Sequence, residues 1–170
     1  MWTKTLAALL TIGAIAGPSA AAADDSEPSG AAVAKYMPTA KITLQEGLTA
    51  AESQGRPLSG KYEVEDGHFQ LSVYTTKDGK FSEVLVDHNT GKVAKSEAIT
   101  EGDDLADAKK QVEACSKSKT SLKVAVDRAE QANGGYRAVS VIPKISNGHP
   151  VAVVSLLRGT QVKSVAEPLE

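Results

Sequence analysis

Residues 62–73 decide the fold, and they read Tyr-Glu-Val-Glu-Asp-Gly-His-Phe-Gln-Leu-Ser-Val. Apolar and polar residues alternate on both sides of Asp66-Gly67, as they do in strands that are buried on one face. The Asp-Gly dipeptide favours a tight hairpin turn, because both central positions of such a turn need a positive φ angle. The stretch therefore predicts two antiparallel strands, 62–65 and 69–73.

Two further turn signals extend this hairpin toward the C-terminus. The sequence Lys-Asp-Gly-Lys at 77–80 precedes a strand-like run at 81–87, and His-Asn-Thr-Gly at 88–91 precedes a short one at 92–94. Asn, Asp and Gly are the residues that turns favour. We expect an antiparallel meander.

A helix is expected immediately before the meander. Residues 43–46 read Thr-Leu-Gln-Glu, a capping-box pattern in which the threonine and glutamate side chains each bond a free backbone amide. Gly55 and Pro57 would end this helix. Its apolar residues recur at helical spacing and must be buried: Leu44, Leu48 and Ala51.

The same order of signals returns in the second half of the chain. Aligning residues 121–123 with 43–45 places Leu122 on Leu44 at an offset of 78 residues. Gly148-His149 falls on Gly67-His68 at an offset of 81. The predicted second-half strands are 138–142, 151–157 and 162–166. This arrangement is typical of a tandem repeat.

A longer helix is expected ahead of this second set of signals. Asp103 or Asp104 can cap it, and an apolar stripe follows at helical spacing: Leu105, Ala108, Val112 and Cys115. Because Cys115 belongs to this stripe, we interpret it as a small buried residue rather than a reactive thiol. The predicted fold class is α+β, with repeat 1 at 40–100 and repeat 2 at 101–170.

The N-terminus has the pattern of a secretory signal peptide. Lys4 precedes an almost wholly apolar run at 6–16, and small residues follow to Ala23. Cleavage after Ala23, or one or two residues earlier, would leave a flexible leader at 24–39 with a possible short helix at 31–37. The alternative is a membrane anchor, but the apolar run is well short of the roughly 20 residues that span a bilayer. We expect a periplasmic or secreted protein with no membrane span after cleavage.

Composition excludes some classes of function. The 170 residues carry a net charge of −2, and without Lys4 the mature chain has 18 basic against 21 acidic residues. The sequence has no excess of basic residues to bind the phosphates of nucleic acid, so nucleic-acid binding is disfavoured. The chain has one cysteine and therefore no internal disulfide, so its stability must come from packing.

The closing segment of repeat 1 carries a family resemblance. Residues 87–93 read Asp-His-Asn-Thr-Gly-Lys-Val, which is similar to the D-x-x-T-G-K-V ending of PepSY domains, and 42–48 resemble the opening helix motif of that family. The likeness covers about residues 40–94. Repeat 2 departs from it, because the chain ends without that motif and Pro143 is expected to interrupt its first strand. The layout of two helix-loop-helix and sheet units is also similar to that of β-lactamase inhibitory proteins.

The resemblance implies an exported, non-catalytic module. PepSY domains occur in propeptides of secreted peptidases and in envelope proteins, and they are thought to inhibit or regulate peptidases. Here no peptidase domain accompanies the repeats, so an inhibitor would act on a separate protein. A fold does not by itself establish that function.

We find no candidate catalytic, cofactor or metal residues in the sequence. No serine lies in a nucleophile motif, and no metal-binding spacing joins the histidines. The turn aspartates lack the spacing of a calcium loop. The residues concerned fit turn or cap positions: His68, His88, His149, Asp66, Asp78, Asp87, Asp103 and Asp104.

The leading hypothesis is a protein that binds a protein partner, with a peptidase as one candidate, through a sheet face or edge. Four residues would lie on the face away from the helices, although a plainly solvated face explains them as well: Lys61, Glu63, Gln70 and Ser72. A small-molecule-binding or metal-binding envelope domain is the alternative, and it predicts a pocket between the repeats. An enzyme with a site assembled across the repeats is a third hypothesis.

Overall fold

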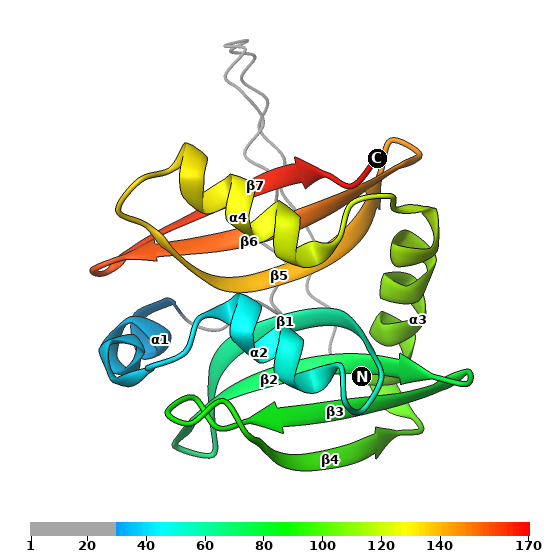
Figure 1. Cartoon of the computed structure of the whole chain (residues 1–170), viewed down its shortest axis with the longest axis horizontal. Helices are drawn as coiled ribbons and strands as arrows, with labels where there is room; N and C mark the ends of the chain where they lie inside the picture. The colour runs from blue at the N-terminus through cyan, green and yellow to red at the C-terminus, as the bar shows by residue number, and fades with distance from the viewer. Residues whose placement is uncertain (1–29) are drawn as a thin grey trace, which may run out of the picture.

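The computed structural model describes residues 30–170, so the predicted signal peptide and residues 24–29 of the leader lie outside it. Seven antiparallel strands form one sheet in the order β4-β3-β2-β1-β5-β6-β7 (Figure 1). The α+β class is confirmed. The strands are β1 (Arg56–Glu65), β2 (His68–Lys77), β3 (Lys80–Val86), β4 (Val93–Ile99), β5 (Arg137–Ser146), β6 (His149–Arg158) and β7 (Gln161–Pro168).

Four α-helices and one 3-10 helix accompany the sheet within residues 30–170. The predicted short helix at 31–37 corresponds to the first of them. The capping box at Thr43 is present as predicted, with both of its hydrogen bonds. The helices are α1 (Gly30–Tyr36), η1 (Met37–Thr39), α2 (Leu44–Ala51), α3 (Gly102–Lys117) and α4 (Leu122–Ala132).

The strands of the two halves follow one spacing. β1, β2 and β3 begin at residues 56, 68 and 80, while β5, β6 and β7 begin at 137, 149 and 161, a difference of 81 in each case. The register slips by one residue at Leu58 in β1 and at Val139 in β5, which are also 81 apart. The halves join at two residue pairs, Gly60–Val141 and Lys61–Ser140. The first pair therefore lies on the local two-fold axis that relates the halves.

Helices α2 and α4 lie side by side on one face of the sheet (Figure 1). Two glycines allow α2 to approach closely. A Cβ atom on Gly47 would collide with Leu71 Cδ2, and one on Gly60 would lie 3.1 Å from Leu48 Cδ2. Lys123 Nζ of α4 lies 2.6 Å from Glu52 Oε1 beside α2, which links the two halves across the helix layer.

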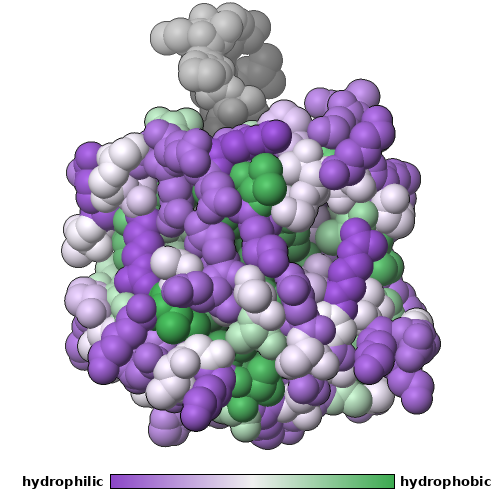
Figure 2. All heavy atoms as spheres, in the orientation of Figure 1, coloured by the Kyte–Doolittle hydropathy of each residue, from purple (hydrophilic) through white to green (hydrophobic). Residues whose placement is uncertain are grey.

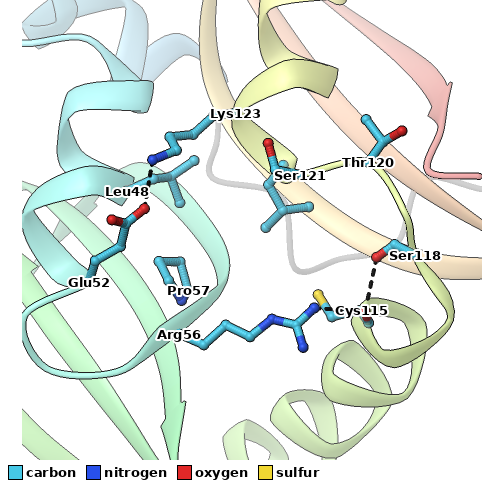
Figure 3. A pocket seen from close by; sticks show the side chains of 10 residues that line it. Leu48, Glu52, Arg56, Pro57, Cys115, Ser118, Thr120, Ser121 and Lys123 are labelled. Atoms are coloured by element: carbon cyan, nitrogen blue, oxygen red, sulfur yellow. Dashed lines mark hydrogen bonds and ion pairs between the residues drawn. The ribbon is translucent and has the colours of Figure 1, made fainter.

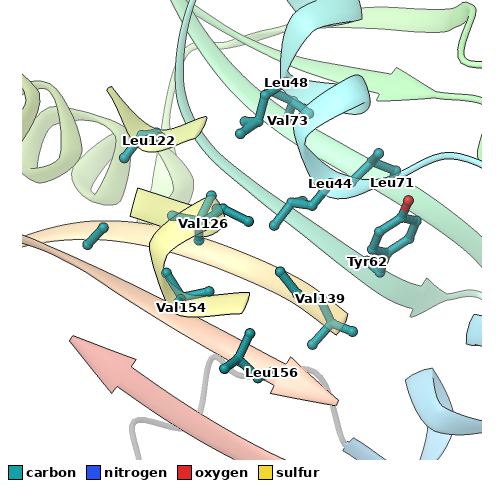
Figure 4. Packing of buried hydrophobic residues seen from close by; sticks show 14 of the residues in the cluster. Leu44, Leu48, Tyr62, Leu71, Val73, Leu122, Val126, Val139, Val154 and Leu156 are labelled. Atoms are coloured by element: carbon teal, nitrogen blue, oxygen red, sulfur yellow. The ribbon is translucent and has the colours of Figure 1, made fainter. Parts of the chain in front are cut away.

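One hydrophobic core lies between these helices and the sheet, and it includes residues of both halves (Figure 4). Its residues are buried, so a cavity made in either half would disturb the packing of this shared core. The residues that Figure 4 places there include Leu44, Leu48, Leu122 and Val126 of the helices and Tyr62, Leu71, Val73, Val154 and Leu156 of the sheet.

Helix α3 crosses the opposite face of the sheet. Its residues Ala108 and Cys115 pack against Leu58 and Tyr74 in a second, smaller cluster. Cys115 is 3% exposed, which confirms its predicted burial. The cap predicted for this helix is wrong: the N-cap residue is Glu101, and it makes no side-chain capping bond. The helix begins at Gly102, ahead of both aspartates, and Gly102 has a positive φ angle of 75°, which glycine adopts without a steric penalty.

The predicted interruption at Pro143 is also wrong, because β5 continues through it to Ser146. Pro143 pairs with Ala152 of β6, whereas β1 meets β5 only at Val141 and Ser140. The edge of β5 toward β1 is unpaired at this point within the described chain, so a proline that lacks an amide hydrogen is tolerated.

The face of the molecule that carries α2 and α4 is mostly hydrophilic at its surface, with apolar residues in small separate patches (Figure 2). Within residues 30–170, no helix is long and apolar enough to cross a membrane.

Candidate functional site

The candidate site is a polar network on the sheet face opposite α2. We call it the carboxylate face and define it by Lys61, Glu63, Glu65, Gln70, Ser72 and Glu83. Side chains alternate between faces along a strand. Because Tyr62, Leu71 and Val84 point into the core beneath the helices, their neighbours in β1, β2 and β3 point the other way.

The four residues singled out from the sequence are brought together on this face. The pairing register sets Lys61 opposite Ser72 and Glu63 opposite Gln70. Lys61 Nζ lies 2.7 Å from Glu63 Oε2, and Gln70 Nε2 donates to Glu63 Oε1 at 3.2 Å. All four thus belong to a connected surface, although the structure names no partner for it.

Two further glutamates complete the network, and sequence analysis did not single them out. Gln70 Nε2 also donates to Glu65 Oε2 at 2.8 Å, and the Ser72 hydroxyl donates to Glu83 Oε1. Glu65 shares the alternation that identified Glu63, so that pattern was the available signal. Glu83 comes from β3, and its place beside Ser72 depends on a register that only the fold supplies.

One ammonium group therefore lies among three carboxylates. Burial disfavours the charge on Lys61, but its hydrogen bond and ion pair with Glu63, together with the charges of Glu83 and Asp104, outweigh this effect and raise its pKa. Burial also raises the pKa of Glu83, and its neighbours Glu63 and Glu65 add to the shift. Lys61 stays protonated at neutral pH, whereas a nucleophilic lysine needs a lowered pKa.

Helix α3 adds one more acidic group at the border of this face. The Tyr74 hydroxyl donates to Asp104 Oδ1 at 2.6 Å. Burial, followed by this bond to Asp104, raises the pKa of Tyr74 well above its usual range. Asp104 thus holds α3 against β2 instead of capping its own helix, and it adds negative potential beside Lys61.

A pocket lies where α2, α3 and α4 meet (Figure 3). This pocket has a volume of about 170 Å³, below the roughly 300–1,000 Å³ of typical small-molecule sites. Its polar lining is already paired: Arg56 Nη2 donates to the Cys115 carbonyl oxygen at 2.7 Å, and Lys123 meets Glu52. Burial raises the pKa of the Cys115 thiol, which makes it a poor nucleophile.

The three histidines lie apart. His68 begins β2, His149 begins β6, and His88 follows β3. His149 Nδ1 lies 2.6 Å from Glu170 Oε1, while the His88 ring meets the edge of Phe69 with the ring centres 4.9 Å apart. No group of three or more histidine, cysteine, aspartate or glutamate side chains suited to a metal occurs within residues 30–170.

The aspartates in loops shape turns. Asp66 and Asp78 have positive φ angles of 48° and 52°. Asp87 Oδ1 accepts hydrogen bonds from the Asn89 and Thr90 amides and from the Thr90 hydroxyl, and the Thr90 bonds contribute most to lowering the pKa of Asp87. Asp103 lies in the first turn of α3, where a carboxylate suits the helix dipole.

The carboxylate face is thus the feature that can recognise a partner: it is polar, acidic and fixed by hydrogen bonds. Glu63 is buried in part, with 13% of its side chain exposed, so its charge is oriented before any partner arrives. No family model, curated protein or solved structure matches the chain.

Proposed function

We propose that this chain is an exported, non-catalytic protein that binds a basic surface of another envelope protein through the carboxylate face. The single observation that carries the proposal is that three glutamates, Glu63, Glu65 and Glu83, share this face with one lysine, Lys61. Its carboxylates exceed its ammonium groups, and complementary charge steers association and selects partners.

The finer architecture belongs to the same proposal. We infer that the chain is a tandem repeat of PepSY-like units whose second copy has diverged. Support comes from the 81-residue spacing of the strands and from the register slips at Leu58 and Val139. The resemblance to PepSY domains makes a peptidase the first partner to test, with inhibition or regulation as the expected effect. The expected location is periplasmic or secreted.

The absence of catalysis is part of the proposal. Lys61 is protonated and ion-paired, and Cys115 is buried with a raised pKa. A small-molecule or metal site was the alternative from sequence, and the helix-junction pocket gives it little support because its charged groups already have partners.

Affinity capture from a periplasmic extract tests the proposal, with the purified chain as bait. We expect recovery of a peptidase or another envelope protein with a basic surface, and the double variant E63K/E65K should lose it. The control E113K reverses an exposed charge on α3, whose ion pair with Lys117 lies within that helix, and it should capture the same protein. A peptidase recovered in this way should lose activity in proportion to added wild-type chain but not to added E63K/E65K.

Two outcomes would contradict the proposal. In one, E63K/E65K, shown to be folded by circular dichroism, captures the partner as well as the wild type. In the other, calorimetry finds a metal or small molecule bound while no protein is captured.

A further inference from the structure

The two halves of the sheet differ in whether a further strand pairs with their outer edge. In the first half, β4 pairs with the outer edge of β3 over residues 93–99. In the second half, β7 occupies the place of β3, and no strand within residues 30–170 pairs with its outer edge. An open edge presents unpaired backbone groups to which another strand can add.

The hairpin fixes which backbone groups of β7 point outward. Arg158 and Gln161 flank the two-residue turn between β6 and β7, and such a flanking pair bonds across the hairpin. Odd-numbered residues of β7 therefore turn their amides toward β6, in agreement with the Leu169 amide, which donates to the Pro150 carbonyl oxygen at 3.0 Å. Val162, Ser164 and Ala166 turn their backbone groups outward. Pro168 also falls on the outward side, where its lack of an amide hydrogen breaks no bond to β6.

The side chains of β7 are complementary to a second β7 that runs antiparallel. Lys163, Val165 and Glu167 lie on the side of α4, since Val165 packs against the core and side chains alternate. A two-fold axis at Val165 sets Lys163 opposite the partner's Glu167, and Glu167 opposite the partner's Lys163. The same register sets outward-facing Ser164 opposite the partner's Ala166, which is a hydrogen-bonding pair.

The neighbouring register lacks this match. An axis at Ser164 would set Lys163 opposite Val165 and Glu167 opposite Gln161, leaving both charges without a counterpart. The favoured register also covers Val162, which is 49% exposed, with the partner's Pro168. Opposite charges directly across an antiparallel pair stabilise it, and like charges destabilise it.

We propose that β7 is a self-association edge through which two copies of the chain form an antiparallel dimer, joining their two sheets into one. This surface is separate from the carboxylate face, so the dimer does not depend on the proposed function.

Sedimentation equilibrium of the full chain over a concentration series tests the dimer. We expect twice the chain mass at high concentration and weaker association at high salt, because the charge pairs are exposed. Ser164→Pro removes an outward amide and should abolish the dimer. K163E and E167K should each weaken it roughly tenfold, because favourable cross-strand pairs become like-charge pairs. The double variant K163E/E167K exchanges the charges and should restore it.

Asn133→Ala is the matched control, because Lys163 also donates to Asn133 Oδ1 within its own chain. It removes that bond, together with the one that Asn133 Nδ2 donates to the Ala129 carbonyl oxygen, and should leave the dimer intact. A monomer at every concentration overturns the proposal, as does a dimer that survives in S164P. Failure of the charge exchange to rescue K163E, with thermal unfolding unchanged, overturns the register and the proposal with it.

Discussion

The two halves of the sheet share a backbone plan and differ in the chemistry of their open face. With the offset of 81 residues, Lys61 corresponds to Ile142 and Glu63 to Lys144. Glu83 corresponds to Ser164. None of the three glutamates of the carboxylate face has a carboxylate at the matching place, since Glu65 corresponds to Ser146. The two halves therefore share the strand spacing, while the carboxylate face belongs to the first half and the open edge to the second.

Removing core volume from each half should have the largest effect on stability. Leu44→Ala in α2 and Leu122→Ala in α4 truncate residues 78 positions apart, which are 1% and 8% exposed. We expect L44A to lower the free energy of unfolding by about 2–5 kcal/mol and L122A by somewhat less. Urea unfolding followed by circular dichroism and by tyrosine fluorescence measures both.

The same experiment asks whether the halves unfold together. Because one core contains residues of both, each variant should shift a single transition that both probes report alike. Two separate transitions, with each variant moving just one of them, would mean that the halves are independent.

Two arginines at corresponding places offer the next comparison. Arg56 begins β1 and donates to one backbone carbonyl oxygen, that of Cys115. Arg137 begins β5 and donates to three, those of Met37, Ala40 and Ile42. Arg137→Met should lower the free energy of unfolding by about 2–3 kcal/mol and Arg56→Met by about 1 kcal/mol. Equal losses in denaturant melts would show that the additional bonds contribute nothing.

The pH dependence of stability should distinguish the halves through Glu83 and Ser164. The pKa of Glu83 is raised in the folded protein above its ordinary value of 4.5, so the folded state binds its proton more tightly than the unfolded state does. Its contribution to stability therefore falls as pH rises from 4.5 through the folded pKa. Urea midpoints at several pH values should show that E83Q lacks this fall, while S164A, with no titrating group, keeps it. A pH profile of E83Q identical to that of the wild type would contradict the prediction.

The smallest effect is expected at β4. Lys95 Nζ and Glu97 Oε2 lie 2.9 Å apart, but both side chains are 56% exposed. The double variant K95A/E97A should change the free energy of unfolding by less than about 0.5 kcal/mol, because water and salt screen exposed pairs. A larger loss in thermal unfolding would indicate that β4 does more than cover the edge of β3.

The elements that were predictable are those whose signals are local. Alternation and the Asp66-Gly67 turn located the first hairpin, the alignment of Gly148-His149 with Gly67-His68 located the second, and the capping box located α2. The first part of β1 was missed because Pro57 and Gly60 are unfavourable in an isolated strand. Tertiary structure explains why β1 accommodates both residues: the register slips beside Pro57, and α2 packs directly over Gly60.

The residues of the candidate site were predictable to the same extent as the secondary structure, namely where the signal is local. Lys61, Glu63, Gln70 and Ser72 share a face by alternation alone, and the structure places them there. Glu83 and Asp104 required knowledge of which strand and which helix lie beside β2. The cap of α3 was predicted wrongly because the helix begins at Gly102, before both aspartates, and Asp104 accepts a hydrogen bond from Tyr74 of β2.

The short seam between the halves has a consequence for the order of folding. Every other strand pair in the sheet joins neighbours along the chain, and each can close soon after its residues are synthesised. The Gly60–Val141 seam instead joins positions 81 residues apart, so β1 must keep one edge open until β5 exists. Until β5 pairs with it, the folding chain therefore carries an open strand edge at what will become the centre of its sheet.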